Sequence, residues 1–194
     1  MSLNRQPGEG GGPEAAIPAK AGIRGFRLRN DAPDVERLEL LVLKLELDEL
    51  NAAYAAALDE RRFDDWPGFF IPEGRYKVQA RENFDRGLPL ALIALESQGM
   101  MKDRVVGITQ TIFHGPYYTR HVLSPTWLVS VDEACVRTQT NYAVFRTRPG
   151  DASEVYNVGR YIDEVVRTPA GLRLASRLCV YDSEMVLNSL IYPI

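Results

Sequence analysis

The sequence predicts an α+β fold in which three helices from the N-terminal half of the chain pack against a strongly curved, mostly antiparallel sheet from the C-terminal half. Between residues 34 and 112, apolar residues recur every three or four positions in several segments, as on one face of a helix. After His114-Gly115-Pro116, apolar and polar residues alternate, as in strands with one buried face. Short turns join these segments, so neighbouring strands should be antiparallel, and the helices can cover one face of the sheet.

The composition is that of an ordinary globular protein. The chain has 194 residues, of which 45% are hydrophobic and 25% charged, and its formal net charge is −3. No apolar run approaches the roughly 20 residues that span a bilayer, and basic residues are scattered, so we expect neither a membrane nor a nucleic acid as partner. Nothing at the N-terminus resembles a secretory signal. Cys135 and Cys179 fit free thiols in a reducing compartment, so we expect a cytoplasmic protein.

Residues 1–33 differ in composition from the rest of the chain. They are rich in Gly, Pro and Ala and show no period, so the sequence predicts a flexible tail followed by one domain over residues 34–194. Ile23, Phe26 and Leu28 give the end of this tail some apolar content. It could therefore order against a partner, although a loose extension is the simpler interpretation.

The first predicted helix begins near Asp34, a suitable N-cap residue, and carries two apolar stripes. The longer stripe consists of Leu40, Leu43, Leu47, Leu50, Tyr54 and Ala57. A second stripe, Leu38, Leu41 and Leu45, lies on roughly the opposite side, so the first half of the helix needs cover on two sides. The core of one domain covers only one side. We expect a second subunit, or an N-terminal arm that folds back, to cover the other.

Shorter elements should follow the first helix. A short second helix fits residues 60–70, with Pro67-Gly68 at its end or at a kink. A strand is predicted over residues 74–82, a turn-rich loop over 83–89 and a brief edge strand over 90–95. The third helix fits residues 97–112, where Met101, Val105, Ile108 and Ile112 share one face.

Four long strands are predicted over residues 119–132, 134–148, 153–168 and 171–183. In the last strand, Leu172, Leu174, Leu178 and Val180 should face the core, and Arg173, Arg177 and Tyr181 should face outward. Such a polar outer face is either solvated or an interface. The residues that we expect at a subunit interface are Leu38, Leu41, Leu45, Arg137, Arg146, Arg160, Arg173 and Arg177.

The chain lacks recognisable cofactor motifs. A Rieske cluster requires two Cys and two His in paired C-x-H and C-x-x-H spacings, and His114, His121, Cys135 and Cys179 do not have them. A mononuclear iron site would require both histidines to converge with a carboxylate, which we do not expect. The run Gly10 to Gly12 has no strand before it and no helix after it, unlike a nucleotide-binding turn. We therefore expect no metal or cofactor in this chain.

A curved sheet covered by helices can enclose a cavity in which acid–base chemistry takes place. The residues expected to line such a cavity are Tyr54, Asp65, Trp66, His121 and Tyr142. The simpler interpretation is that His121 is a hydrogen-bonded structural residue and that the aromatic residues are core. We therefore assign no catalytic residue.

Several strings resemble the small β subunits of aromatic-ring-hydroxylating dioxygenases. They are Asp103-Arg104-Val105, Thr119-Arg120-His121, Tyr142 to Arg148 (YAVFRTR), Val158-Gly159-Arg160-Tyr161 followed by Asp163, and the closing LRLASRLCVYDSEMVL. They occur in the family's order from about Leu38 to the end of the sequence. Pro125 departs from the family, which often has an asparagine there. The ending LIYPI resembles the terephthalate-type and anthranilate-type subunits more than the biphenyl and naphthalene ones.

The resemblance implies an NTF2-like, or SnoaL-like, cone-shaped fold and a non-catalytic structural β subunit. In that family three α and three β subunits form a hexamer, the α subunits hold the Rieske [2Fe–2S] cluster and the mononuclear Fe(II), and a reductase or ferredoxin supplies electrons. The whole enzyme would cis-dihydroxylate an aromatic compound with O₂ and NAD(P)H, and this chain would not be active alone. Two alternatives stay open. One is a free-standing isomerase or dehydratase with an acid–base pocket around His121, and the other is a binding module for a small aromatic ligand.

Overall fold

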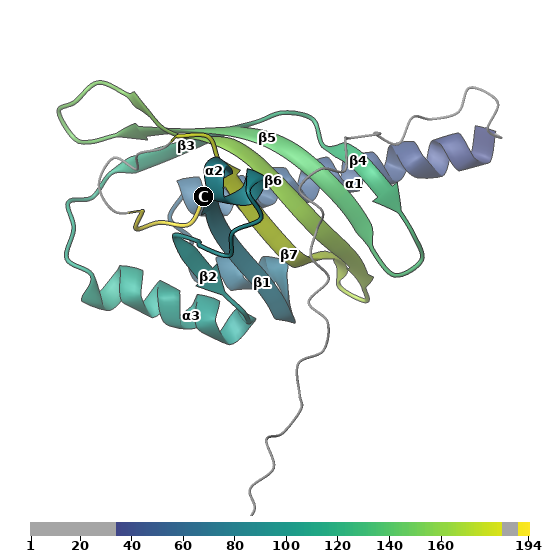
Figure 1. The fold of residues 1–194 in the computed structure, drawn as a ribbon, viewed down its shortest axis with the longest axis horizontal. Coiled ribbons are helices and arrows are strands. Elements are labelled where there is room, and N and C mark those ends of the chain that lie inside the picture. Colours follow the sequence, from purple (N-terminus) through teal and green to yellow (C-terminus); the bar gives the residue numbers. More distant parts are fainter. Residues whose placement is uncertain (1–33, 184–189) are drawn as a thin grey trace, which may run out of the picture.

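The computed structural model describes residues 34–183 and 190–194, so the predicted N-terminal tail, residues 1–33, lies outside the described residues. Figure 1 shows the arrangement of the elements. Their order is α1 (Asp34–Asp59), η1 (Trp66–Phe69), β1 (Phe70–Ala80), α2 (Arg81–Asp85), β2 (Ile93–Leu95), α3 (Gln98–Val106), η2 (Gly107–Thr111), β3 (Tyr118–Leu123), β4 (Trp127–Val131), β5 (Val136–Thr147), β6 (Glu154–Thr168) and β7 (Gly171–Tyr181).

The seven strands form one curved sheet in the order β2-β1-β7-β6-β5-β3. Strand β4 pairs with the first part of β5, along the same edge of β5 as β3. The pairing is antiparallel except between β1 and β7, which run parallel. Helix α1 packs against β3 and β7, and α3 packs against β1. The first turns of α1 project past β4 at one end of the sheet (Figure 1). The predicted fold class, helices against a strongly curved and mostly antiparallel sheet, is confirmed.

The helices follow the apolar spacing with one exception. Helix α1 buries Leu47, Tyr54 and Ala57, and α3 buries Met101 and Val105, as predicted. The Ser97 side chain caps α3 by accepting a hydrogen bond from the Met100 N–H. The predicted second helix is wrong: only the short 3₁₀ turn η1 forms there, and its proline lies at the start rather than at the end. A proline is favourable in the first turn of a helix, because an N–H at that position has no acceptor within the helix and nothing is lost when it is absent.

The predicted strand over residues 119–132 is interrupted at Pro125. Strand β3 ends at Leu123 and β4 begins at Trp127. Proline cannot donate a ladder hydrogen bond, and the next N–H, that of Thr126, points to α1 and donates to Asp48 Oδ1 at 2.7 Å. The link between β3 and β4 therefore anchors the sheet to α1.

A β-bulge in β7 changes which residues face the core. Glu164 of β6 pairs with Ser176, but the next residue, Val165, pairs with Leu174, so Ala175 is an extra residue on β7. Leu174 faces the core as predicted. Beyond the bulge the alternation is shifted by one residue, and Arg177 points inward with a fully buried side chain. The prediction that Arg177 and Tyr181 lie on the outer face is therefore wrong.

Candidate functional site

A buried ion pair lies at the centre of the inner face of the sheet. Arg177 of β7 donates from Nε to Asp163 Oδ1 at 3.0 Å and from Nη2 to Asp163 Oδ2 at 2.7 Å. The same Nη2 donates to Asn51 Oδ1 of α1. Burial raises the pKa of Asp163, and the charge of Arg177 opposes that shift. Burial alone would lower the pKa of Arg177, but the charge of Asp163 raises it. The pair thus joins β6, β7 and α1 by charge-assisted hydrogen bonds.

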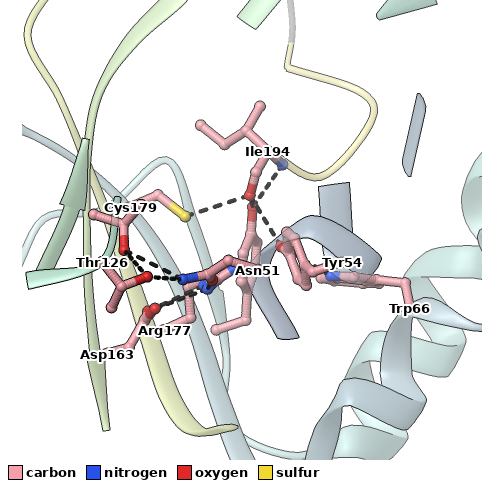
Figure 2. A network of polar contacts seen from close by, with 10 residues as sticks. Asn51, Tyr54, Trp66, Thr126, Asp163, Arg177, Cys179 and Ile194 are labelled. Carbon is pink, nitrogen blue, oxygen red and sulfur yellow. Dashed lines mark hydrogen bonds and ion pairs between the residues drawn. The ribbon is translucent and has the colours of Figure 1, made fainter. Parts of the chain in front are cut away.

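Aromatic rings and threonine hydroxyls lie around this ion pair, and Figure 2 shows Tyr54 and Thr126 among them. The guanidinium carbon of Arg177 lies 4.1 Å from the ring centroid of Tyr54 and 4.1 Å from that of Tyr161. A cation between two ring faces is attracted by both. Tyr142 stacks on Tyr161 with 4.4 Å between centroids. Asn51 Nδ2 donates to the hydroxyls of Thr126 and Thr140 at 3.0 and 3.2 Å. Side chains therefore fill this part of the interior.

Ile194 fills the neighbouring part of the interior and is 1% exposed. Its main-chain oxygen accepts hydrogen bonds from Tyr54 OH at 3.0 Å, Tyr76 OH at 3.1 Å and Cys179 Sγ at 3.5 Å. Its N–H donates to Tyr76 OH at 2.9 Å, and Trp66 Nε1 donates to Tyr54 OH at 3.1 Å. Burial raises the pKa of both tyrosines, and it raises the pKa of Cys179 to about 12. At neutral pH these groups are therefore protonated donors.

The residues expected to line a pocket divide into three groups. Tyr54, Trp66 and Tyr142 come together in the interior, but they pack on one another or on neighbouring side chains. Asp65 does not join them. Its side chain is 55% exposed and pairs with Arg62 at 2.5 Å, because the chain around it forms surface turns instead of the predicted helix. His121 lies at a third place, beside the end of α1.

His121 forms a dyad with Asp59, the last residue of α1. His121 Nδ1 lies 2.6 Å from Asp59 Oδ1, and the His121 N–H donates to Asp59 Oδ2 at 2.9 Å. Burial would raise the pKa of Asp59, but these hydrogen bonds lower it below the usual range. The His121 side chain is fully buried, and its Nε2 makes no hydrogen bond with any described residue. Sequence reasoning missed Asp59 because it lies 62 residues from His121 and no local motif links the two.

The two histidines do not converge. His114 Nε2 contacts Tyr192 OH at 2.8 Å, whereas His121 is bound to Asp59. Within residues 34–183 and 190–194, no group of three or more His, Cys, Asp or Glu side chains is placed to hold a metal ion. In the same part of the chain, no helix is both long and apolar enough to cross a membrane.

The second leucine stripe of α1 is exposed. Leu38, Leu41 and Leu45 are 62%, 49% and 66% exposed, and Val35 and Val42 on the same half of the helix are 69% and 47% exposed. On the flank of this half, α1 forms a groove of about 650 Å³ with the end of the sheet. The groove is lined by Glu36, Leu38, Glu39, Leu40, Val42, Leu43, Glu46, Val131 and Arg167.

The arginines expected at an interface are not all on the surface. Arg137 is exposed and Arg160 and Arg173 are partly exposed, whereas Arg146 is only 4% exposed. Arg146 has the same parity along β5 as the inward-facing Val144, so its side chain turns inward, donates to Glu154 at 2.6 and 2.8 Å and lies over the Tyr156 ring. The prediction that Arg146 points outward, toward an interface, is therefore wrong.

The outer face of the sheet is more apolar than expected. Val122 of β3 pairs with Ala143 of β5, which pairs with Val158 of β6, so these residues form one row across three strands. Val122 is 54% and Val158 is 37% exposed. Trp127 of β4, which is 51% exposed, begins a neighbouring row. Their parity in the strands could have identified them, because they alternate with buried residues.

Comparisons with known proteins agree on one family. Residues 40–178 match the model of the SnoaL-like domain. The chain is similar to the anthranilate 1,2-dioxygenase small subunit of Burkholderia cepacia, with 35% identity over 77% of this chain and 92% of that protein. It is 27% identical to the terephthalate 1,2-dioxygenase terminal oxygenase component subunit beta 2 of Comamonas sp, over 79% of this chain and 100% of that protein. A crystal structure of the β subunit assigned to an aromatic-ring-hydroxylating dioxygenase of Novosphingobium aromaticivorans has a TM-score of 0.74 and 35% identity, and covers 80% of this chain and 99% of that chain.

Proposed function

Because this chain belongs to the SnoaL-like family, and within it to the small subunits of aromatic-ring-hydroxylating dioxygenases, we propose that it is the non-catalytic structural β subunit of such an enzyme. Its partner would be a large α subunit that holds the Rieske [2Fe–2S] cluster and the mononuclear Fe(II), in a cytoplasmic α₃β₃ hexamer. A reductase or ferredoxin would deliver electrons from NAD(P)H. The complete enzyme would use them with O₂ to cis-dihydroxylate an aromatic compound.

The exposed half of α1 is the observation that carries the proposed structural role. A helix that is apolar on two sides requires cover on both, and within residues 34–183 and 190–194 only the side of Leu40, Leu43 and Leu47 is covered. Fully burying a leucine stabilises a protein by roughly 1.5–3 kcal/mol. Covering Leu38, Leu41 and Leu45 would therefore contribute several kcal/mol to an assembly. Contiguous exposed apolar surface of this kind is typical of a subunit interface.

The outer face of the sheet supplies a second proposed contact. Its apolar row through Val122 and Val158 is accompanied by the side chains of Arg137, Arg160 and Arg173. An apolar centre with arginines nearby is a common composition of protein interfaces. We propose that this face also meets a neighbouring subunit in the hexamer.

The occupied interior supports the non-catalytic part of the proposal. The charges of Arg177 and Asp163 neutralise each other, and the main-chain oxygen of Ile194 accepts hydrogen bonds from the hydroxyls of Tyr54 and Tyr76. A catalytic pocket would need polar groups that are free to face a substrate. These groups face one another or Ile194 instead.

Co-expression with the cognate large subunit tests the proposal. The two chains should co-purify as a coloured complex with the mass of an α₃β₃ hexamer in light scattering. Replacing Leu41 and Leu45 by serine should abolish co-purification and leave the isolated chain folded, because both side chains are exposed. Leu90→Ser is the matched control, since Leu90 is also an exposed leucine, at 65%, but lies outside α1. A chain that stays colourless and unbound beside its large subunit would refute the proposal.

A free-standing isomerase or dehydratase is the second candidate function, and the His121–Asp59 dyad favours it. A carboxylate that orients one nitrogen of an imidazole leaves the other available for proton transfer. Turnover by the purified chain without a partner, lost in His121→Ala while the circular dichroism spectrum is unchanged, would support this candidate. Activity that appears only with the large subunit and persists in His121→Ala would exclude it.

A further inference from the structure

The groove beside the first half of α1, here called the α1 groove, presents apolar side chains at the surface. Leu40 and Leu43 are partly buried in it, whereas Leu38, Val42 and Val131 are exposed. Its volume of about 650 Å³ accommodates several side chains. Figure 1 shows that the first turns of α1 project past β4 at this end of the sheet. An occupant of the groove would therefore cover apolar surface that the described residues leave open.

The side of α1 that faces the groove is also acidic. Glu39 and Glu46 are two helical turns apart, so they lie on one side of the helix. Glu46 is paired with Arg167 at 2.9 Å, whereas no ion pair within residues 34–183 and 190–194 includes Glu36 or Glu39. Cationic side chains brought to the groove would therefore meet two carboxylates that have no counter-charge in the described part of the chain.

A segment just before α1 has the complementary composition. Residues 20–30, KAGIRGFRLRN, are here called the basic arm and lie outside the described residues. They contain four basic residues and no acidic one, although the whole chain carries a net charge of −3. Their large apolar residues are Ile23, Phe26 and Leu28. The basic arm therefore matches the α1 groove both in charge and in apolar character.

The basic arm is close enough in the sequence to reach the groove. Only residues 31–33 separate it from the start of α1. The lining residues of α1 extend over ten residues, which rise about 15 Å in a helix, and seven extended residues span roughly 23 Å. Residues 23–29 are therefore long enough to run back along the groove. Asp31 and Pro33 favour a change of direction, because aspartate is common in turns and proline disfavours helix in the residue before it.

We propose that the basic arm folds back along α1 and docks in the α1 groove as an internal cover. In an extended segment Phe26 and Leu28 point to the same side and enter the apolar part of the groove. Arg27 and Arg29 alternate with them, and their long side chains reach the glutamates at the rim. Docking thus buries apolar surface and pairs the two carboxylates at once.

The short link favours the chain's own arm over any other occupant. A segment tethered by a few residues has a high effective concentration at its site, whereas a second copy or another protein must also offset the entropy of association. The docking goes beyond the proposed subunit role and does not depend on it. Leu41 and Leu45, on which that role relies, are not among the described residues that line the groove.

Disulfide formation in the full chain tests the docking. All variants carry Cys135→Ser, so that the remaining native thiol is the buried Cys179. Leu28→Cys/Val42→Cys should form a disulfide within one chain roughly tenfold faster than Leu28→Cys/Leu45→Cys, because docking concentrates the arm at the groove. Leu45 is the matched control, since it is an exposed residue of the same half of α1 but does not line the groove.

Charge reversal on each side tests the ion pairs. Adding Glu36→Lys/Glu39→Lys to the pair at residues 28 and 42 should slow disulfide formation roughly fivefold, because two surface ion pairs are replaced by repulsion. Adding Arg27→Glu/Arg29→Glu as well should restore most of the original rate. The circular dichroism spectrum should stay unchanged throughout, since Glu36 and Glu39 are exposed.

Several results would overturn the proposal. Equal rates at residues 42 and 45 would show that the arm has no preferred place on α1. Disulfides that join two chains, seen as dimers on a non-reducing gel, would assign the groove to a second copy. A charge reversal on α1 that the reversed arm does not rescue would remove the argument from charge.

A measurement on the wild type avoids substitutions altogether. Trypsin should cleave after Arg27 several-fold more slowly than after Arg5, because Arg27 lies in the docked arm and Arg5 lies outside it. Equal cleavage rates at the two arginines would contradict docking. All these experiments use the isolated chain, so their outcome is independent of whether it assembles with a large subunit.

Discussion

Replacing Asp163 by alanine should destabilise the fold more than most single substitutions. The substitution leaves the guanidinium of Arg177 without its counter-charge in a place where the Arg177 side chain is fully buried. Breaking a buried ion pair from one side costs about 3–5 kcal/mol. For a chain of this size each kcal/mol corresponds to about 2–4 °C, so Tm should fall by about 6–20 °C. Urea unfolding followed by circular dichroism and thermal unfolding by calorimetry measure the two quantities.

A second substitution and a surface control make this prediction specific. The double variant Asp163→Ala/Arg177→Met should recover most of the loss, because the uncompensated buried charge is then absent. Arg137→Ala removes an ion pair with Glu164 in which the Arg137 side chain is 53% exposed, and it should cost no more than about 1 kcal/mol. If Asp163→Ala costs no more than Arg137→Ala, or if the double variant is less stable than the single one, the argument for a buried ionic centre is wrong.

Three further predictions concern other parts of the interior. The pKa of Asp59 is lowered in the folded state, so this carboxylate stabilises the fold above its unfolded pKa, and the stabilisation is lost as pH falls through the folded pKa. The difference in urea midpoint between the wild type and Asp59→Asn should therefore shrink on acidification below about pH 4. Gly159→Ala should lower Tm by several degrees, because a Cβ at Gly159 would overlap the Val180 main-chain oxygen and approach Tyr142 OH to 2.9 Å. Gly68→Ala is the control, since nothing lies within 4 Å of a Cβ at Gly68. Cys179 should react with a thiol reagent only on unfolding, because it is buried and its pKa is raised to about 12, whereas the half-buried Cys135 should react in the native protein. Equal reaction rates of the two thiols in the native protein, measured by absorbance, would contradict this.

Much of the fold could be predicted from local pattern, and its departures have local physical causes. The apolar stripes located α1 and α3, and alternation located the long strands, because periodicity reflects which face is buried. Alternation cannot reveal a bulge, however, and the single extra residue Ala175 moved Arg177 from the predicted outer face to the core. The break between β3 and β4 was not predicted, although Pro125 cannot donate a ladder hydrogen bond, and nothing in the sequence indicated that Asp48 would hold the link between the two strands.

The candidate sites were harder to predict because they depend on pairs that are far apart in the sequence. His121 and Asp59 are 62 residues apart, and Arg177 and Asn51 are 126 residues apart. Their side chains meet only because α1 crosses the inner face of the sheet. Residues 190–194 show neither helical nor strand periodicity, and the contacts of Ile194 with Tyr54 and Tyr76 span 140 and 118 residues. By contrast, the exposed leucine stripe was predictable, because a helix with two apolar sides shows both of them in its sequence.

The interior and the exterior of this protein should respond differently to substitution, and that difference bears on its proposed role. Inside, the ionic and aromatic groups are held mainly by one another, so changes there reduce stability and affect assembly only through folding. Outside, Leu41, Leu45 and Trp127 are about half exposed or more in the isolated chain, so polar substitutions there should change stability by no more than about 0.5 kcal/mol. If the chain is a structural subunit, those same substitutions must weaken assembly with the large subunit. A residue that affects assembly without affecting stability therefore marks the interface directly, and the exposed half of α1 is where such residues should be found first.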